Sequence, residues 1–151
     1  MVDAEIRQRC ERFRDWEDDF LEKGPFNLQG ATEAQIQSLL DFVGCPLPED
    51  YLEFLRFSNG FLDLLSVEDV LRDTLFFQEY ESGGLVIGND GGEGIIVLDL
   101  HIVLDLRDGA ASAMSYAYMP DERHDWEHVG ARWPDFKALF LKITPDPDKL
   151  L

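Results

Sequence analysis

Apolar residues recur at helical spacing within residues 31–60. Four of them lie three or four positions apart and therefore share one side of a helix: Ile36, Leu39, Leu40 and Val43. Thr32 and Gln35 form a capping-box pair just before this stripe. Gly44 follows it, where a left-handed C-terminal cap is favourable for glycine. The pattern predicts a capped amphipathic helix that ends at Gly44.

A second helix is predicted after the Leu47-Pro48 corner. Proline suits the first turn of a helix because its missing N–H would be unpaired there. Acidic residues at positions 49 and 50 lie near this N-terminus, where the helix dipole favours negative charge. Asn59-Gly60 ends the helix. Its buried side is expected to comprise Tyr51, Leu52, Phe54 and Leu55.

Further helices are predicted nearer the two ends of the chain. Residues 3–22 form one, with an apolar side made of Ile6, Cys10, Phe13, Phe20 and Leu21. Another begins at Ser66, where the following Leu75-Phe76-Phe77 run suits either a continuing helix or a strand. The last begins at Pro134 and is expected to bury Phe136, Leu139, Phe140 and Ile143.

Short β-rich runs occupy the region after residue 82. Residues 85–88 and 95–98 flank a turn rich in Gly, Asp and Asn, which is typical of a hairpin. Residues 102–104 and 113–119 are further candidate strands. This order predicts the α+β class, with N-terminal helices packed on a mainly antiparallel sheet and a closing C-terminal helix. We expect an N-terminal helical extension over 1–30, one domain over 31–144 and a C-terminal tail over 145–151.

The charge of the chain restricts its partners. Its 151 residues carry a net charge of −18, from 31 acids and 13 bases. Residues 31–110 hold 16 of the acids and only three arginines, so they contribute −13. Nucleic acids and anionic membranes are bound through basic patches, so we expect neither as a direct partner. A basic protein partner fits, and a merely solubilising acidic surface is the alternative.

Cysteine usage and hydropathy indicate a cytoplasmic protein. Cys10 and Cys45 make no metal motif and are too few for a disulfide framework, so we expect two buried thiols. The N-terminus has no apolar signal region, and no apolar run of eighteen residues occurs. We therefore expect no membrane association.

Candidate catalytic and metal-binding chemistry is weak. His124 and His128 have the spacing of a zinc pair on a helix, but their surroundings favour a polar loop. The glycine loop over 88–94 lacks phosphate-binding spacing and leads into a strand, which favours a hairpin turn. An acid–base enzyme is the remaining alternative, with its only candidate carboxylates at Asp90, Glu93, Asp99 and Asp105. We expect no catalytic site, no metal and no cofactor.

Three motifs resemble the SMI1/KNR4 (SUKH) superfamily. The first is Leu-Pro-Glu-Asp-Tyr-Leu-Glu-Phe-Leu over 47–55 with the Asn-Gly stop, and the second is the strand–turn–strand over 85–100. The third is a closing helix after a tryptophan-bearing segment, over 126–140. The motif residues are expected to be structural: Leu47, Pro48, Tyr51, Phe54, Leu55, Asn59, Gly60, Asp90, Gly91 and Gly92.

The resemblance implies a cytoplasmic immunity protein that neutralises a cognate toxin, frequently a nuclease, by direct binding. The superfamily also includes regulatory adaptors, which are the alternative function. An acidic surface can mimic the phosphates that a nuclease binds, so we expect a basic toxin domain as the partner. The predicted partner-binding residues are the acidic cluster after Gly60, together with one tryptophan: Asp63, Glu68, Asp69, Asp73, Glu79, Glu81 and Trp126.

Overall fold

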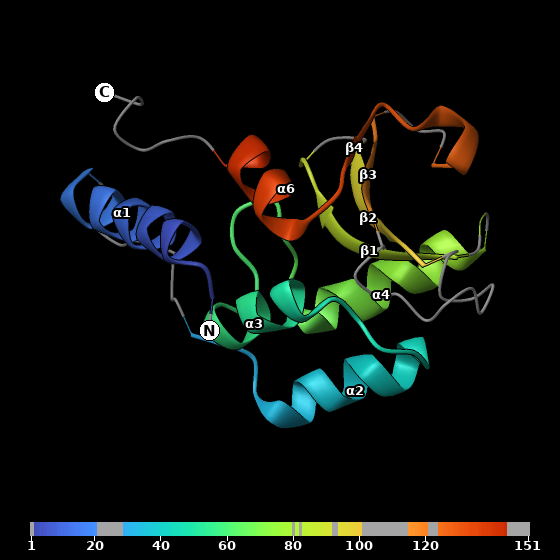
Figure 1. The fold of residues 1–151 in the computed structure, drawn as a ribbon, viewed down its shortest axis with the longest axis horizontal. Helices are drawn as coiled ribbons and strands as arrows, with labels where there is room; N and C mark the ends of the chain where they lie inside the picture. The colour runs from blue at the N-terminus through green and yellow to red at the C-terminus, as the bar shows by residue number, and fades with distance from the viewer. Residues whose placement is uncertain are drawn as a thin grey trace.

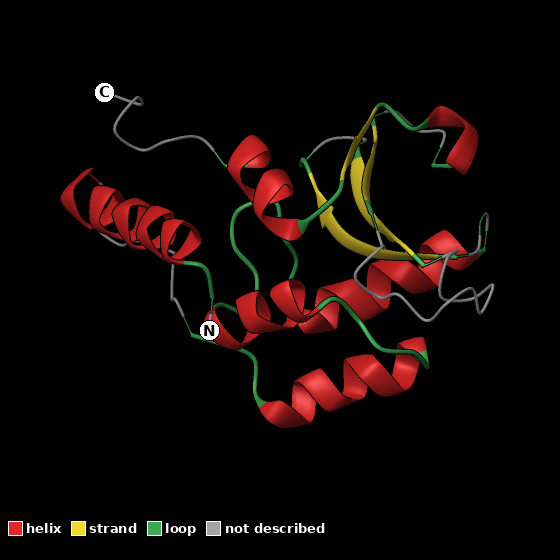
Figure 2. Ribbon diagram, viewed as in Figure 1, coloured by secondary structure: helices red, strands yellow, loops and turns green. Residues whose placement is uncertain are grey.

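The computed structural model describes residues 2–20, 29–79, 81, 83–91, 94–100, 115–120 and 124–144. The helices are α1 (Ala4–Phe20), α2 (Glu33–Val43), α3 (Glu49–Phe57), α4 (Val67–Gln78), the 3-10 helix η2 (Trp126–His128) and α6 (Phe136–Ile143). The strands are β1 (Gly84–Asn89), β2 (Ile95–Asp99), β3 (Tyr116–Met119) and β4 (Ala131–Trp133). They form an antiparallel sheet in the order β1-β2-β3-β4, with α4 packed beside β1, α6 beside β4 and the other main helices to one side of the sheet (Figures 1 and 2). The predicted α+β class is confirmed.

The predicted capping chemistry defines α2. The Thr32 hydroxyl accepts from the Gln35 backbone N–H, and the Gln35 side chain accepts from the Thr32 N–H at 2.8 Å. Gly44 ends the helix in the left-handed region at a φ of 77°. The prediction for α3 needs one correction, because Pro48 lies one position before the helix and not in its first turn. There its ψ of 132° is extended, as suits the residue from which a helix begins.

Helix α4 settles the alternatives left open for the Leu75-Phe76-Phe77 run, which is entirely helical. Val67, Val70, Thr74 and Phe77 are buried at helical spacing. Leu75 and Phe76 lie outside this buried side and face solvent. In Figure 1, α4 runs beneath the sheet on the β1 side.

The sheet begins with the predicted hairpin, in which Leu85 pairs with Leu98 and Val86 with Val97. The outer edge of β1 is covered by the segment that leads to α4, since the Leu65 N–H donates to the Ile87 carbonyl at 2.9 Å. Strand β3 confirms the expectation for its part of 113–119, whereas β4 and η2 were not predicted. The candidate strand over 102–104 and the tail over 145–151 lie outside the described residues.

The core lies mainly between the helices and one face of the sheet. Phe54, Phe136 and Phe140 form its aromatic centre, with ring centroids 5.0 to 6.0 Å apart. Helix α6 begins two residues after Pro134, because the Asp135 side chain caps it by accepting from the Ala138 N–H at 2.7 Å.

The other face of the sheet carries a smaller cluster of Phe77, Val86, Val97 and Met119, against which Trp126 packs. Apolar contacts therefore hold α4 to the sheet from both sides of β1.

The two cysteines differ in burial. Cys10 on α1 is fully buried within the main core, as expected. The expectation of burial is wrong for Cys45, which is half-exposed. Its position between Gly44 and Pro46, in the corner after α2, places it outside both helices.

Candidate protein-binding surface

The start of α4 is fixed by two side chains that precede it. The Ser66 hydroxyl accepts from the Asp69 N–H at 3.3 Å, and the Asn59 side-chain oxygen accepts from the Val67 N–H at 2.8 Å. Further along the helix, the buried Thr74 hydroxyl accepts from the Val86 N–H of β1 at 2.9 Å. These bonds fix which side of α4 faces the sheet and which side faces solvent.

The solvent side of α4 combines exposed apolar side chains with charge. Leu75 is 55% exposed and Phe76 is 62% exposed, so two large apolar side chains next to each other in the sequence are open to solvent. Phe76 follows Arg72 and Asp73 by one helical turn and Asp69 by two. We refer to Asp69, Arg72, Asp73, Leu75, Phe76 and Glu79 as the outer face of α4.

The outer face of α4 is acidic in spite of its one arginine. Arg72 lies between two carboxylates, 3.1 Å from Asp69 and 3.0 Å from Asp73, and its hydrogen bond to Asp73 is the main cause of its raised pKa. Glu79 adds a further negative charge at the end of the helix. Three acids against one base leave this face with a net negative charge.

Of the remaining predicted partner residues, Glu68 also lies on α4, one turn before Arg72, and the others lie elsewhere. Asp63 is half-buried in the turn before α4, and burial, followed by the charge of Asp90, raises its pKa. Glu68 accepts hydrogen bonds from Gln35 and Asn59, and its pKa is lowered, chiefly by the hydrogen bond from its own backbone N–H. Both side chains therefore have structural neighbours in addition to solvent.

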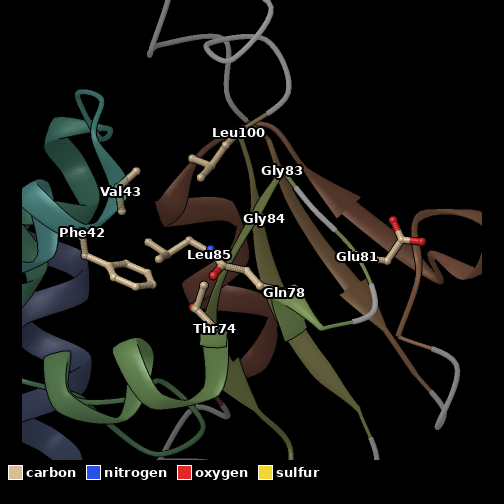
Figure 3. A pocket seen from close by; sticks show the side chains of 9 residues that line it. All are labelled: Phe42, Val43, Thr74, Gln78, Glu81, Gly83, Gly84, Leu85 and Leu100. Carbon is tan, nitrogen blue, oxygen red and sulfur yellow. The ribbon is translucent and has the colours of Figure 1, made fainter. Parts of the chain in front are cut away.

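Glu81 borders a cavity of about 360 Å³ between the ends of α2 and α4 and the start of β1. Figure 3 shows apolar side chains of α2, β1 and Leu100 gathered on one side of this cavity, with Glu81 standing apart from them. The cavity is lined by Phe42, Val43, Thr74, Gln78, Glu81, Gly83, Gly84, Leu85 and Leu100. Glu81 is therefore not part of the outer face of α4.

Trp126 is held against the sheet. Its ring lies edge-on to Phe77 with centroids 6.3 Å apart, and the Arg132 guanidinium lies 5.7 Å from it. A side chain on Gly84 would reach within 3.0 Å of the indole, so glycine makes room for this packing. Of the seven predicted partner residues, only Asp69, Asp73 and Glu79 share the outer face of α4.

The candidate catalytic carboxylates within the described chain take part in structural bonds. Asp90 accepts from the Gly94 N–H at 3.2 Å and from the Tyr118 hydroxyl, a bond that raises the pKa of Tyr118 to about 12. Asp99 pairs with Arg132 at 3.1 Å. Glu93 and Asp105 lie outside the described residues.

The histidine pair has no shared metal site in the described ranges. His128 Nδ1 lies 2.5 Å from Asp125, and His124 precedes the 3-10 helix instead of sharing a helix with His128. Among the residues that the structure describes, no three His, Cys, Asp or Glu side chains converge on a common point.

The motif residues have structural positions. Leu47, Pro48, Tyr51, Phe54 and Leu55 are buried. Gly60 has a φ of 97° and Gly91 a φ of 80°, which glycine adopts readily. Asn59 caps α4, and Asp90 closes the hairpin turn, whereas Gly92 lies outside the described residues.

Sequence reasoning missed two structural features. Asp50 joins three elements, because it accepts from the Phe136 N–H of α6 at 3.0 Å and from the Tyr116 hydroxyl of β3 at 3.3 Å. No local signal predicts these distant partners. The exposure of Leu75 and Phe76 could have been found by extending the helical spacing of Val67 and Val70 through residue 77.

Comparison with known proteins assigns the chain to a family. The sequence model of the SMI1/KNR4 family (SUKH-1) matches residues 30–142, which begins after α1 and ends within α6. No curated protein matched the chain. In the described ranges no helix has the length and apolar character that crossing a bilayer requires. Since the match covers about three quarters of the sequence, the chain belongs to the SMI1/KNR4 family (SUKH-1).

Proposed function

We propose that this protein is a non-catalytic, cytoplasmic immunity protein that neutralises a cognate toxin by binding it. The family to which it belongs is known for immunity proteins. The observation that carries the proposal is the exposure of Phe76 and Leu75 on an acidic helix face. Phenylalanine is one of the aromatic residues enriched in the buried centre of protein interfaces.

The charge of the protein supports a basic toxin domain, such as a nuclease, as the partner. A net charge of −18 attracts a positive protein over several ångströms and raises the association rate. Charge alone gives modest affinity, because exposed ion pairs contribute little each. Burial of the exposed Leu75 and Phe76 side chains against the partner would add affinity. The outer face of α4 thus combines electrostatic attraction with an apolar anchor.

Rescue of cells from the protein encoded next to this gene tests the proposal. Cells that express the neighbouring protein should die, and co-expression of this chain should restore growth. The double variant Leu75→Ser/Phe76→Ser should weaken binding by at least about thirtyfold, as loss of an interface hot spot does. Its free energy of unfolding should change little, because both side chains face solvent.

Leu62→Ser is the matched control, since it also removes an exposed leucine but lies in the turn before α4. It should leave rescue intact. The proposal fails if the neighbouring protein is harmless, or if the double variant rescues as well as the unaltered chain does. Association that is equally fast in low and high salt would contradict the role of charge.

A regulatory adaptor is the alternative within the same family. An adaptor would also use an exposed helix face, but its gene would need no toxin beside it. Rescue therefore separates the two functions, because only an immunity protein protects against its neighbour.

A further inference from the structure

A small cavity opens beside Phe76, between α4, the first two strands and the segment before η2. Its volume is about 190 Å³. Helix α4, strands β1 and β2 and His124 provide its walls: Asp73, Phe76, Phe77, Val86, Ile95 and His124. The cavity therefore adjoins the outer face of α4 and shares Asp73 and Phe76 with it.

The lining of this cavity is apolar except at its rim. Phe77 and Val86 are buried and form its floor, whereas Ile95 is half-buried and Phe76 is 62% exposed, so these two supply most of the surface open to an aliphatic chain. Asp73 is the one carboxylate, with a side chain 24% exposed. Its Oδ1 accepts from Arg72 at 3.0 Å, and a carboxylate can accept from more than one donor.

We propose that this cavity receives an arginine side chain from the basic partner; this inference rests on the proposed function. The aliphatic part of arginine contacts Val86 and Ile95, and its guanidinium lies against the Phe76 ring and donates to Asp73. A guanidinium is planar, weakly hydrated and able to stack on an aromatic ring while it donates to a carboxylate.

Charge complementarity selects this occupant over an apolar one. A purely apolar side chain would displace water from Asp73 and add no donor to the one that Arg72 provides, which costs free energy. A lysine would bring charge but could not match the ring and the carboxylate with one planar group. The chain itself pairs guanidinium groups with rings, since Arg7 lies 4.9 Å from the Phe57 ring centroid.

Titration of the full chain with small amides tests the inference without knowledge of the partner. N-acetyl-arginine N-methylamide is added up to about 50 mM, a range that detects binding far weaker than a protein interface provides. Methyl ¹³C chemical shifts of Val86 and Ile95 report occupancy of the cavity. The citrulline analogue has the same shape without the charge and should bind about fivefold more weakly.

The variant Asp73→Asn should bring the affinity for the arginine amide down to that of the citrulline amide. Asp41→Asn makes the same charge change on α2, outside the cavity, and should leave the titration unchanged. The inference is overturned if the Val86 and Ile95 methyl groups do not respond, or if the citrulline amide binds equally well. Equal binding of the lysine or norleucine amide would likewise exclude arginine as the specific occupant.

The outcomes separate this inference from the proposed function. Rescue by the chain, together with no response to the arginine amide, removes the arginine site and leaves immunity standing. A specific arginine response, together with a harmless neighbouring protein, removes the immunity function and leaves a site for a basic partner.

Discussion

Replacing Asn59 with alanine should destabilise the protein by freeing the start of α4. The Asn59 side-chain oxygen accepts from the Val67 N–H at 2.8 Å, and Val67 is only 1% exposed. Water cannot easily replace the lost acceptor at such a position. A buried N–H without a partner costs about 1–3 kcal/mol, and loss of a capping side chain costs about 1 kcal/mol. We therefore expect Asn59→Ala to lower the free energy of unfolding by about 2 kcal/mol.

Urea denaturation followed by circular dichroism measures this loss. A urea m-value of about 2 kcal/mol/M, which suits a domain of this size, converts the loss into a midpoint shift of about 1 M. Asn59→Asp is the matched variant, because its carboxylate can still accept from Val67 although it faces Glu68. It should lose less than half as much stability as Asn59→Ala. A midpoint shift below about 0.25 M for Asn59→Ala would refute the assignment of Asn59 as a cap of α4.

Three further predictions use other local features. Leu62 has a φ of 52° and is 41% exposed, so Leu62→Gly should relieve backbone strain and raise the free energy of unfolding by about 0.5 kcal/mol; a lower urea midpoint would contradict this. Burial raises the pKa of the Cys10 thiol to about 12, whereas Cys45 is half-exposed. A thiol reagent should therefore label one equivalent of the native protein, and Cys45→Ser should abolish that reaction; rapid labelling of both thiols would exclude this difference. The pKa of Glu68 is lowered on folding from its ordinary value of 4.5. Its ionised form therefore stabilises the protein at pH values above about 4.5. The stability advantage over Glu68→Gln should fade as the pH falls from about 6 to about 3, and a difference that is constant over this range would argue against the prediction.

The helices that sequence predicted most accurately are those whose signals are local. In α2 the cap, the capping partner and the stop are Thr32, Gln35 and Gly44, all within thirteen positions. Each acts on backbone groups of its own helix, so no knowledge of the remaining chain is needed. The hairpin of β1 and β2 was predictable for the same reason, since its turn residues adjoin both strands.

The features that sequence reasoning missed depend on distant segments. Asp50 accepts a hydrogen bond from Phe136, 86 positions away, and Trp126 is partly buried because it packs against Phe77 of α4 and the sheet. Strand β4 has only three residues and forms through pairing with β3, so its apolar pattern is too short to indicate a strand. These elements are determined by tertiary contacts and not by their own composition.

The acidic cluster shows why closeness in sequence is a weak guide to a shared surface. Asp69 and Asp73 are four positions apart on one helix and face the same way. Glu68, next to Asp69, accepts hydrogen bonds from Gln35 and Asn59 instead, because these two side chains lie beside the start of the helix. The position of α4 in the structure was therefore needed to decide which of the predicted acidic residues share one face.

In the proposed function, stability and recognition use opposite sides of the same helix, which would allow the binding surface to change independently of the fold. Val70, Thr74 and Phe77 hold α4 to the sheet, and Asn59 fixes its start. Substitutions on the outer face remove neither a core contact nor a cap, so each should alter stability by less than about 0.5 kcal/mol. A new partner could thus be accommodated by changing exposed positions such as Phe76, while the motif residues stay as they are. Residues that identify the family and residues that select the partner are, on this argument, different residues.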